Sequence, residues 1–239
     1  MPDEKAHPNC MCMLIPQVTP RQEKGNRNPG ELLARVDAQT RKRMAPKWAR
    51  ELNALGVDWD RMLDPESRWF TTKKALAARV GKDSIGTMQA LGRSLETPTW
   101  PASKFGLRGG MWRKTRRSLA RHIDEPEVRR LVEQVENGGA VDSRTLHYIK
   151  RKWLDGWPLR SPRDLDRYYA ETLSASDAVV FQKSEGTRYH VYSGELGRTA
   201  VVQPDGRRIT VMPDDLDRLT AELGEPKWNV QALIATIST

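Results

Sequence analysis

The chain has 239 residues, of which 38% are hydrophobic and 30% are charged, and its formal net charge is +9. This length fits one large domain or two small ones. No run of about 18 apolar residues is present, so the sequence predicts no membrane-spanning helix. The positive charge favours a polyanionic partner such as nucleic acid.

Residues 1–30 are predicted to form a flexible arm, because they are rich in Pro, Gly, Asn and charge and can bury little apolar surface. The arm contains His7, Cys10 and Cys12, and these are the only two cysteines of the chain. Three soft ligands fall short of the four that a structural zinc site uses, and a disulfide at this spacing would be strained. We therefore predict no metal site and no cofactor.

Residues 31–173 are predicted to form a basic helical region. Apolar residues recur at helical spacing from Glu31, and Pro46 is expected to divide the first stretch into two helices, the second ending at Gly56. A further helix is expected after Asp64 and Pro65. More helices are predicted over 83–96, 111–123, 125–139, 142–157 and 161–174, with a loop over 97–110. Asp142 or Ser143 is expected to cap the helix over 142–157, and Ser161 the one over 161–174.

Residues 174–239 are predicted to form a small α+β domain. Four β-branched or aromatic runs, over 178–182, 188–193, 199–203 and 207–213, alternate in the manner of strands. A helix should follow over 214–224, and 229–239 fits a strand or a helix equally well. The predicted fold class is therefore α+β: a mainly helical N-terminal two-thirds followed by a small antiparallel four-stranded sheet with a helix. Residues 174–239 carry a net charge of −2, so the rest of the chain carries +11, which supports two modules.

The segment from Lys104 to His122 holds seven Lys or Arg and no acid. Arg113, Arg117 and Arg121 fall at i, i+4 and i+8 and are predicted to form one stripe on a helix, with Trp112, Leu119 and Ile123 on another side. Such a stripe suits contacts with a phosphate backbone and reads no sequence. The candidate nucleic-acid-binding residues are Lys104, Arg108, Arg113, Lys114, Arg116, Arg117, Arg121, Lys150 and Lys152. The alternative is an ordinary solvated helix face.

Strand alternation places Arg188, His190 and Tyr192 on one face of the sheet, and it predicts that Arg208 and Thr210 share a face in the fourth strand. Metal-free RNA cleavage needs a base, an acid and cations that stabilise the charged phosphate. The candidate catalytic residues are therefore His190, Arg188, Tyr192, Arg208, Thr210 and Lys183. The alternative is a solvated face that carries no chemistry.

The stretch "HPNCMCMLIP" resembles the segment that closes the Mu F-type minor head protein domain of tailed phages. His7, Pro8, Cys10, Cys12, Leu14 and Pro16 match that segment, while Met11 stands where Arg is usual. The resemblance implies a tail of a longer head protein. Such proteins often carry C-terminal toxin domains, and residues 174–239 resemble, in element order, ribonuclease toxins of the barnase, EndoU, colicin and RelE-like type.

The sequence thus leads to two hypotheses of different classes. The first is a phage-derived protein whose C-terminal domain is a metal-independent endoribonuclease, with RNA as substrate and an acidic immunity protein as partner. The second is a non-catalytic virion protein that binds packaged DNA and contacts phage head or portal proteins. Both predict localisation in the phage virion or the bacterial host cytoplasm, with no membrane partner.

Overall fold

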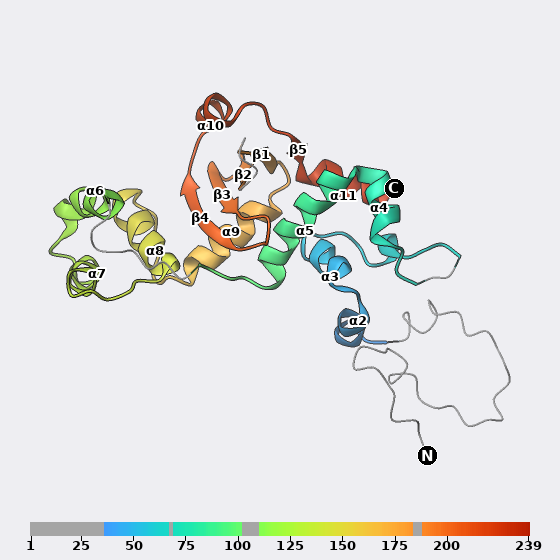
Figure 1. Cartoon of the computed structure of the whole chain (residues 1–239), viewed down its shortest axis with the longest axis horizontal. Helices are drawn as coiled ribbons and strands as arrows, with labels where there is room; N and C mark the ends of the chain where they lie inside the picture. Colours follow the sequence, from blue (N-terminus) through green and yellow to red (C-terminus); the bar gives the residue numbers. More distant parts are fainter. Residues whose placement is uncertain (1–35, 67–68, 102–109, 184–187) are drawn as a thin grey trace, which may run out of the picture.

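The computed structural model describes residues 36–66, 69–101, 110–183 and 188–239 (Figure 1). Helix α2 (Ala38–Met44) and helix α3 (Lys47–Ala54) lie on either side of Pro46, which confirms the predicted break. The Asp37 carboxylate caps α2 by accepting a 2.9 Å hydrogen bond from the Thr40 amide. No helix in the described ranges is long and apolar enough to cross a membrane.

The next helix begins later than the sequence predicts. Helix α4 (Lys73–Val80) starts after Thr72, whose hydroxyl accepts a hydrogen bond from the Ala75 amide. The expected start at Asp64 is therefore wrong. The intervening chain is held by Phe70, which is buried and has Trp48, Trp59 and Trp69 packed edge-on around its ring at 5.8–6.3 Å between centroids. Burying this aromatic cluster contributes more than continuing a helix through the segment would.

Helix α5 (Lys82–Glu96) crosses α3 very closely. A Cβ atom at Gly92 would lie 1.7 Å from the Glu51 carbonyl oxygen, so only glycine permits this approach. The Glu51 side chain is fully buried at the crossing, where it accepts hydrogen bonds from Gln89 (2.9 Å) and Arg93 (2.7 Å). A buried carboxylate is tolerated when it is paired in this way.

Three helices form a group at one end of the molecule (Figure 1). They are α6 (Gly110–Leu119), α7 (Pro126–Glu136) and α8 (Ser143–Leu154), and a 3-10 turn, η3 (Ala120–His122), follows α6. Asp142 caps α8 through the Thr145 amide at 2.9 Å, as the sequence predicts. Helix α9 (Asp164–Ser174) then leads to the sheet. It starts three residues after the predicted cap at Ser161, because Asp164 accepts hydrogen bonds from the Arg160 and Ser161 amides and holds that turn outside the helix.

The sheet is antiparallel throughout, with the strand order β4-β3-β2-β1-β5. Its strands are β1 (Val179–Gln182), β2 (Tyr189–Ser193), β3 (Arg198–Val202), β4 (Arg208–Pro213) and β5 (Trp228–Asn229). The α+β class, with a helical N-terminal part and a C-terminal sheet, is confirmed. The sheet has five strands in the described residues rather than four, because the short β5 adds to β1.

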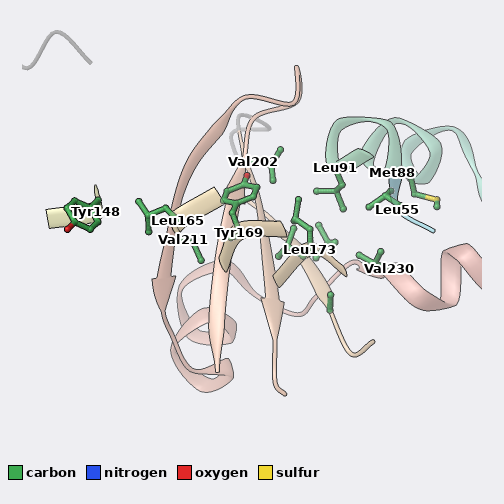
Figure 2. Close-up of a cluster of buried hydrophobic side chains, with 14 of the residues drawn as sticks. Leu55, Met88, Leu91, Tyr148, Leu165, Tyr169, Leu173, Val202, Val211 and Val230 are labelled. Atoms are coloured by element: carbon green, nitrogen blue, oxygen red, sulfur yellow. The ribbon is translucent and has the colours of Figure 1, made fainter. Parts of the chain in front are cut away.

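Helix α9 covers one face of the sheet. Leu165, Tyr169 and Leu173 pack there against strand residues such as Val202 and Val211 (Figure 2). The Tyr169 hydroxyl donates a 2.9 Å hydrogen bond to the Val201 carbonyl. We call this side of the sheet the α9 face.

The opposite side, here called the α10 face, lies under helix α10 (Leu216–Leu223), which packs against β1. Phe181 in β1 and Leu219 in α10 are both almost completely buried. Apolar burial on both sides distinguishes this sheet from one that has a fully solvated face.

The C-terminal segment, which the sequence leaves undecided, forms helix α11 (Val230–Ser238). Asn229 caps it by accepting a 2.8 Å hydrogen bond from the Ala232 amide. Helix α11 returns to pack against α4. One hydrophobic core therefore runs across the change from helices to strands at residue 174, with Leu52 and Met88 at one end and Val211 at the other.

Candidate functional site

The α10 face carries four of the six candidate catalytic residues. His190 and Tyr192 alternate along β2 as predicted, and Arg188 comes directly before the strand. The register pairs His190 with Phe181 and Val201, and pairs Val201 with Thr210, so Thr210 lies in the same cross-strand row. Lys183 is exposed at the adjacent strand end, where its amide donates to the Arg188 carbonyl at 3.3 Å.

His190 is only partly exposed. Its Nδ1 is buried and has no hydrogen-bond partner among the described residues. Burial lowers the pKa of His190, and repulsion from Arg188 lowers it further, while Asp214 acts in the opposite direction. The imidazole is therefore held neutral near pH 7, as a general base requires.

Tyr192 lies in a more acidic part of the same face. Burial raises the pKa of its hydroxyl, and the carboxylates of Asp177, Asp215 and Asp214 raise it further. These negative charges disfavour an approaching phosphate. The cationic end of the α10 face is instead the end formed by Lys183 and Arg188, next to His190.

Arg208 does not lie on this face, so the prediction that it shares a face with Thr210 is wrong. A bulge between Val201 and Val202 pairs Val202 with Arg208, while Val201 pairs with Thr210. The extra residue in β4 turns Arg208 to the α9 face. The two-residue alternation of apolar and polar residues in the sequence does not reveal a bulge of this kind.

The Arg208 side chain is 3% exposed and takes part in a structural network. Its guanidinium donates to Asp166 at 2.7 Å and to the Ser94 carbonyl at 3.2 Å, and it lies 4.6 Å from the centre of the Tyr169 ring. Asp166 also accepts from Trp100 (2.8 Å) and Arg144 (3.0 Å). Arg208 thus links the sheet to the helices.

Thr210 is also buried. Its hydroxyl lies 3.1 Å from His147 Nδ1 in α8. Burial, followed by repulsion from Arg151 and Lys150, lowers the pKa of His147 to about 3. His147 is therefore a neutral, partly buried histidine that packs α8 on β4, and Thr210 is its partner.

The basic helix α6 presents one buried side and one charged side. Trp112, Thr115 and Leu119 are buried. Among the exposed cations, we call Arg113, Lys114, Arg117 and Arg121 the α6 basic surface. The helix ends at Leu119, so Arg121 lies in the 3-10 turn and the predicted i, i+4, i+8 stripe is helical only as far as Arg117. Ile123, expected on the apolar side, is 39% exposed.

Lys150 extends the α6 basic surface onto the neighbouring helix α8. Burial lowers its pKa, as do Arg151 and then Lys114, which shows that Lys114 and Lys150 repel each other. Arg116 and Lys152 are placed differently: each pairs at 2.8 Å with an acid of α7, Glu136 and Glu127 respectively. Lys104 and Arg108 lie outside the described residues.

The structure also contains a cavity of about 670 Å³ that the sequence did not reveal. It lies where the N-terminal ends of α4 and α5 meet β1, β2 and β5. Its walls come from residues 73–87 and residues 182–228, which are at least 95 residues apart in the sequence, so only the folded chain brings them together.

No family model, curated protein or solved structure matches this chain. The segment with His7, Cys10 and Cys12, which carries the Mu F-type resemblance, lies outside the described residues. Within the described ranges, no group of three or more His, Cys, Asp or Glu could hold a metal ion.

Proposed function

We propose that this protein binds nucleic acid through the α6 basic surface by contacting the phosphate backbone. The observation that carries the proposal is the division of α6 into two sides. One side is fixed in the core by Trp112, Thr115 and Leu119, and the other presents Arg113, Lys114 and Arg117 to solvent without an acid in the helix itself. A rigid row of cations suits a regularly spaced polyanion.

The repulsion between Lys114 and Lys150 supports the same conclusion. Repulsion from a neighbouring ammonium disfavours the charged form of Lys150 in the free protein. A phosphate placed between the two ammonium groups would relieve the repulsion. These contacts are to the backbone, so binding is expected to be independent of sequence.

The test is the salt dependence of binding to a fluorescently labelled duplex of about 20 base pairs, measured by anisotropy with the full chain. Replacing Arg113, Lys114 and Arg117 by Gln removes three cations. The slope of log K against log salt should then become less negative by about 2.7, from about 0.9 for each phosphate contact.

Arg116→Gln is the matched control, because Arg116 lies on the same helix and pairs with Glu136. It should leave the slope within about 0.5 of the wild-type value, since no phosphate contact is lost. A triple variant that keeps the wild-type slope would refute the proposed interface.

We propose metal-independent ribonuclease activity as a second candidate function, and one observation favours it. His190 is held neutral near pH 7 and lies beside Arg188, with Lys183 at the same strand end. The imidazole would accept the 2′-hydroxyl proton as that oxygen attacks phosphorus, and the cations would stabilise the charged phosphate. The P–O5′ bond then breaks, and the 5′ oxygen takes a proton from water. The support for a phage setting, with head, portal or immunity proteins as partners, is the resemblance at residues 7–16.

RNA cleavage in EDTA tests this candidate. His190→Gln should lower the rate by about 100-fold, and the product should carry a cyclic phosphate. His122 lies at the end of the 3-10 turn η3 and packs on Trp153, so His122→Gln should leave the rate unchanged. Intact RNA after incubation with the wild-type chain would exclude the activity.

A further inference from the structure

The cavity between α4, α5 and the sheet edge combines cations with aromatic rings. Three lysines, Lys73, Lys74 and Lys82, line it, together with the rings of Tyr189 and Trp228. The rings meet edge to face, with 6.4 Å between their centroids and an angle of 75°. Its volume of about 670 Å³ falls in the usual range of small-molecule sites.

The positions of the lysines run against the local electrostatics. Lys73 and Lys74 are the first two residues of α4, and Lys82 is the first residue of α5. The N-terminal end of a helix carries partial positive charge and favours anions, so cations there destabilise the free protein. Two successive helices thus bring like charges to one cavity, an arrangement that a bound anion would stabilise.

The start of α5 adds hydrogen-bond donors to the cavity. Gly81 joins α4 to α5 with φ of +88°, a conformation that glycine adopts without strain, and it provides no side chain to cap α5. Lys82, Asp83 and Gly86 of the first turns of α5 line the cavity. Backbone N–H groups at an uncapped helix start, next to lysines, are typical partners of phosphate oxygens.

The rest of the lining indicates more than a simple anion. Ala77 and Ile85 provide apolar surface, and the aromatic rings offer faces on which a planar base can stack. Asp83 also lines the cavity, and a carboxylate accepts hydrogen bonds from hydroxyl or amino groups. A ligand with a phosphate, a planar ring and hydrogen-bond donors matches all three features.

From these observations we propose that the cavity binds a nucleotide, with its phosphate at Lys73, Lys74 and Lys82 and its base against Tyr189 and Trp228. The site is separate from the α6 basic surface, since α4 and α6 lie at opposite ends of the molecule (Figure 1). The nucleotide is either free or one unit of a single strand.

Gly86 provides a way to fill the cavity without changing a charge. It lines the cavity from within α5, and a Cβ atom at this position meets no other atom within 4 Å. Gly86→Leu therefore places a side chain in the part of the cavity that the nucleotide would occupy. Leucine also favours a helix over glycine, so the variant is expected to fold.

The experiment is calorimetric titration of the full chain with adenosine 5′-monophosphate, adenosine, inorganic phosphate and an oligouridylate of eight residues. The mononucleotide should bind at least about tenfold more tightly than adenosine or phosphate alone, because only it reaches both parts of the site. Gly86→Leu should weaken this binding by about tenfold or more, as should replacing Lys73, Lys74 and Lys82 by Gln. Gly86→Ala, which adds a single methyl group, should bind as the wild type or slightly more weakly.

The two sources of the ligand are distinguished by the oligouridylate. If it binds in a Gly86→Leu-sensitive way and the mononucleotide does not, the ligand is a unit of a single strand. If the duplex-binding slope of the α6 basic surface stays unchanged in Gly86→Leu, the two sites are independent.

The proposal is overturned if neither the mononucleotide nor the oligouridylate binds the wild type, or if Gly86→Leu and the lysine variant both bind as tightly as the wild type. Equal affinity for phosphate and mononucleotide would also overturn it, because the rings would then have no part. Should Gly86→Leu lower the melting temperature, the lysine variant decides, since all three side chains are exposed and their loss does not disturb the core.

Discussion

Arg208→Ala is expected to destabilise the fold strongly, although the sequence alone suggested that this residue serves catalysis. The guanidinium is 3% exposed and donates to Asp166 and to the Ser94 carbonyl. Removing it leaves that carbonyl without a donor and Asp166 with a reduced set of partners. Removing one member of a buried ion pair costs about 3–5 kcal/mol.

The lower end of this range applies, because Asp166 keeps its hydrogen bonds from Trp100 and Arg144 and is itself 31% exposed. We therefore expect a loss of about 3 kcal/mol, which corresponds to about 6–12 °C in melting temperature for a chain of this size. The adjacent Arg207 provides the control. It is 51% exposed and pairs with Asp205 across a turn, so Arg207→Ala should change stability by about 0.5 kcal/mol or less.

Thermal unfolding of the two variants and the wild type, followed by circular dichroism at one protein concentration, measures the difference. If the melting temperature of Arg208→Ala lies within about 2 °C of that of Arg207→Ala, Arg208 does not take part in a stabilising buried network. A ribonuclease assay of the same variants separates the two interpretations further. If Arg208 has a structural role alone, the fraction of activity that Arg208→Ala loses should equal the fraction of protein that is unfolded.

Two further predictions concern the core. Gly92→Ala should destabilise the protein by about 3 kcal/mol in chemical denaturation, since its Cβ would lie 1.7 Å from the Glu51 carbonyl oxygen and would push α3 away from α5. In the same helix Gly86→Ala has open space and should stabilise by up to about 1 kcal/mol; equal effects at the two glycines would contradict the close crossing. Burial lowers the pKa of His147 to about 3 in the folded protein. As the pH falls, the imidazole is therefore protonated first in the unfolded state, and the free energy of unfolding decreases from about pH 6.5 downward. Between pH 7 and pH 5 the wild type should therefore lose about 2 kcal/mol more than His147→Gln, and identical pH profiles would show that the imidazole is not buried as described.

The sequence by itself determined the secondary structure wherever a local signal was decisive. Proline at position 46 cannot continue a helix, and α2 and α3 separate there. The carboxylate of Asp142 caps α8 because it reaches the free amide of Thr145. The four predicted strands appear because β-branched and aromatic residues alternate in short runs between turns. Each of these signals acts within a few residues of the chain.

The same local signals gave part of the candidate interface. The charged side of α6 follows from helical periodicity, which places Arg113 and Arg117 on one side and Trp112 on another. Periodicity did not show that the helix ends at Leu119, or that Arg116 is paired with Glu136 of α7. Those outcomes depend on a neighbouring helix.

Only the tertiary structure decided the rest. The bulge in β4 arises from pairing with β3, and it moves Arg208 from the expected face into a buried network with Asp166. The charges of Asp214 and Glu222 that act on His190, and the walls of the cavity between Lys82 and Trp228, likewise come from segments distant in sequence. Residue type and spacing specify which side of an element a side chain occupies, but partners from elsewhere in the chain set its burial, its pKa and its neighbours.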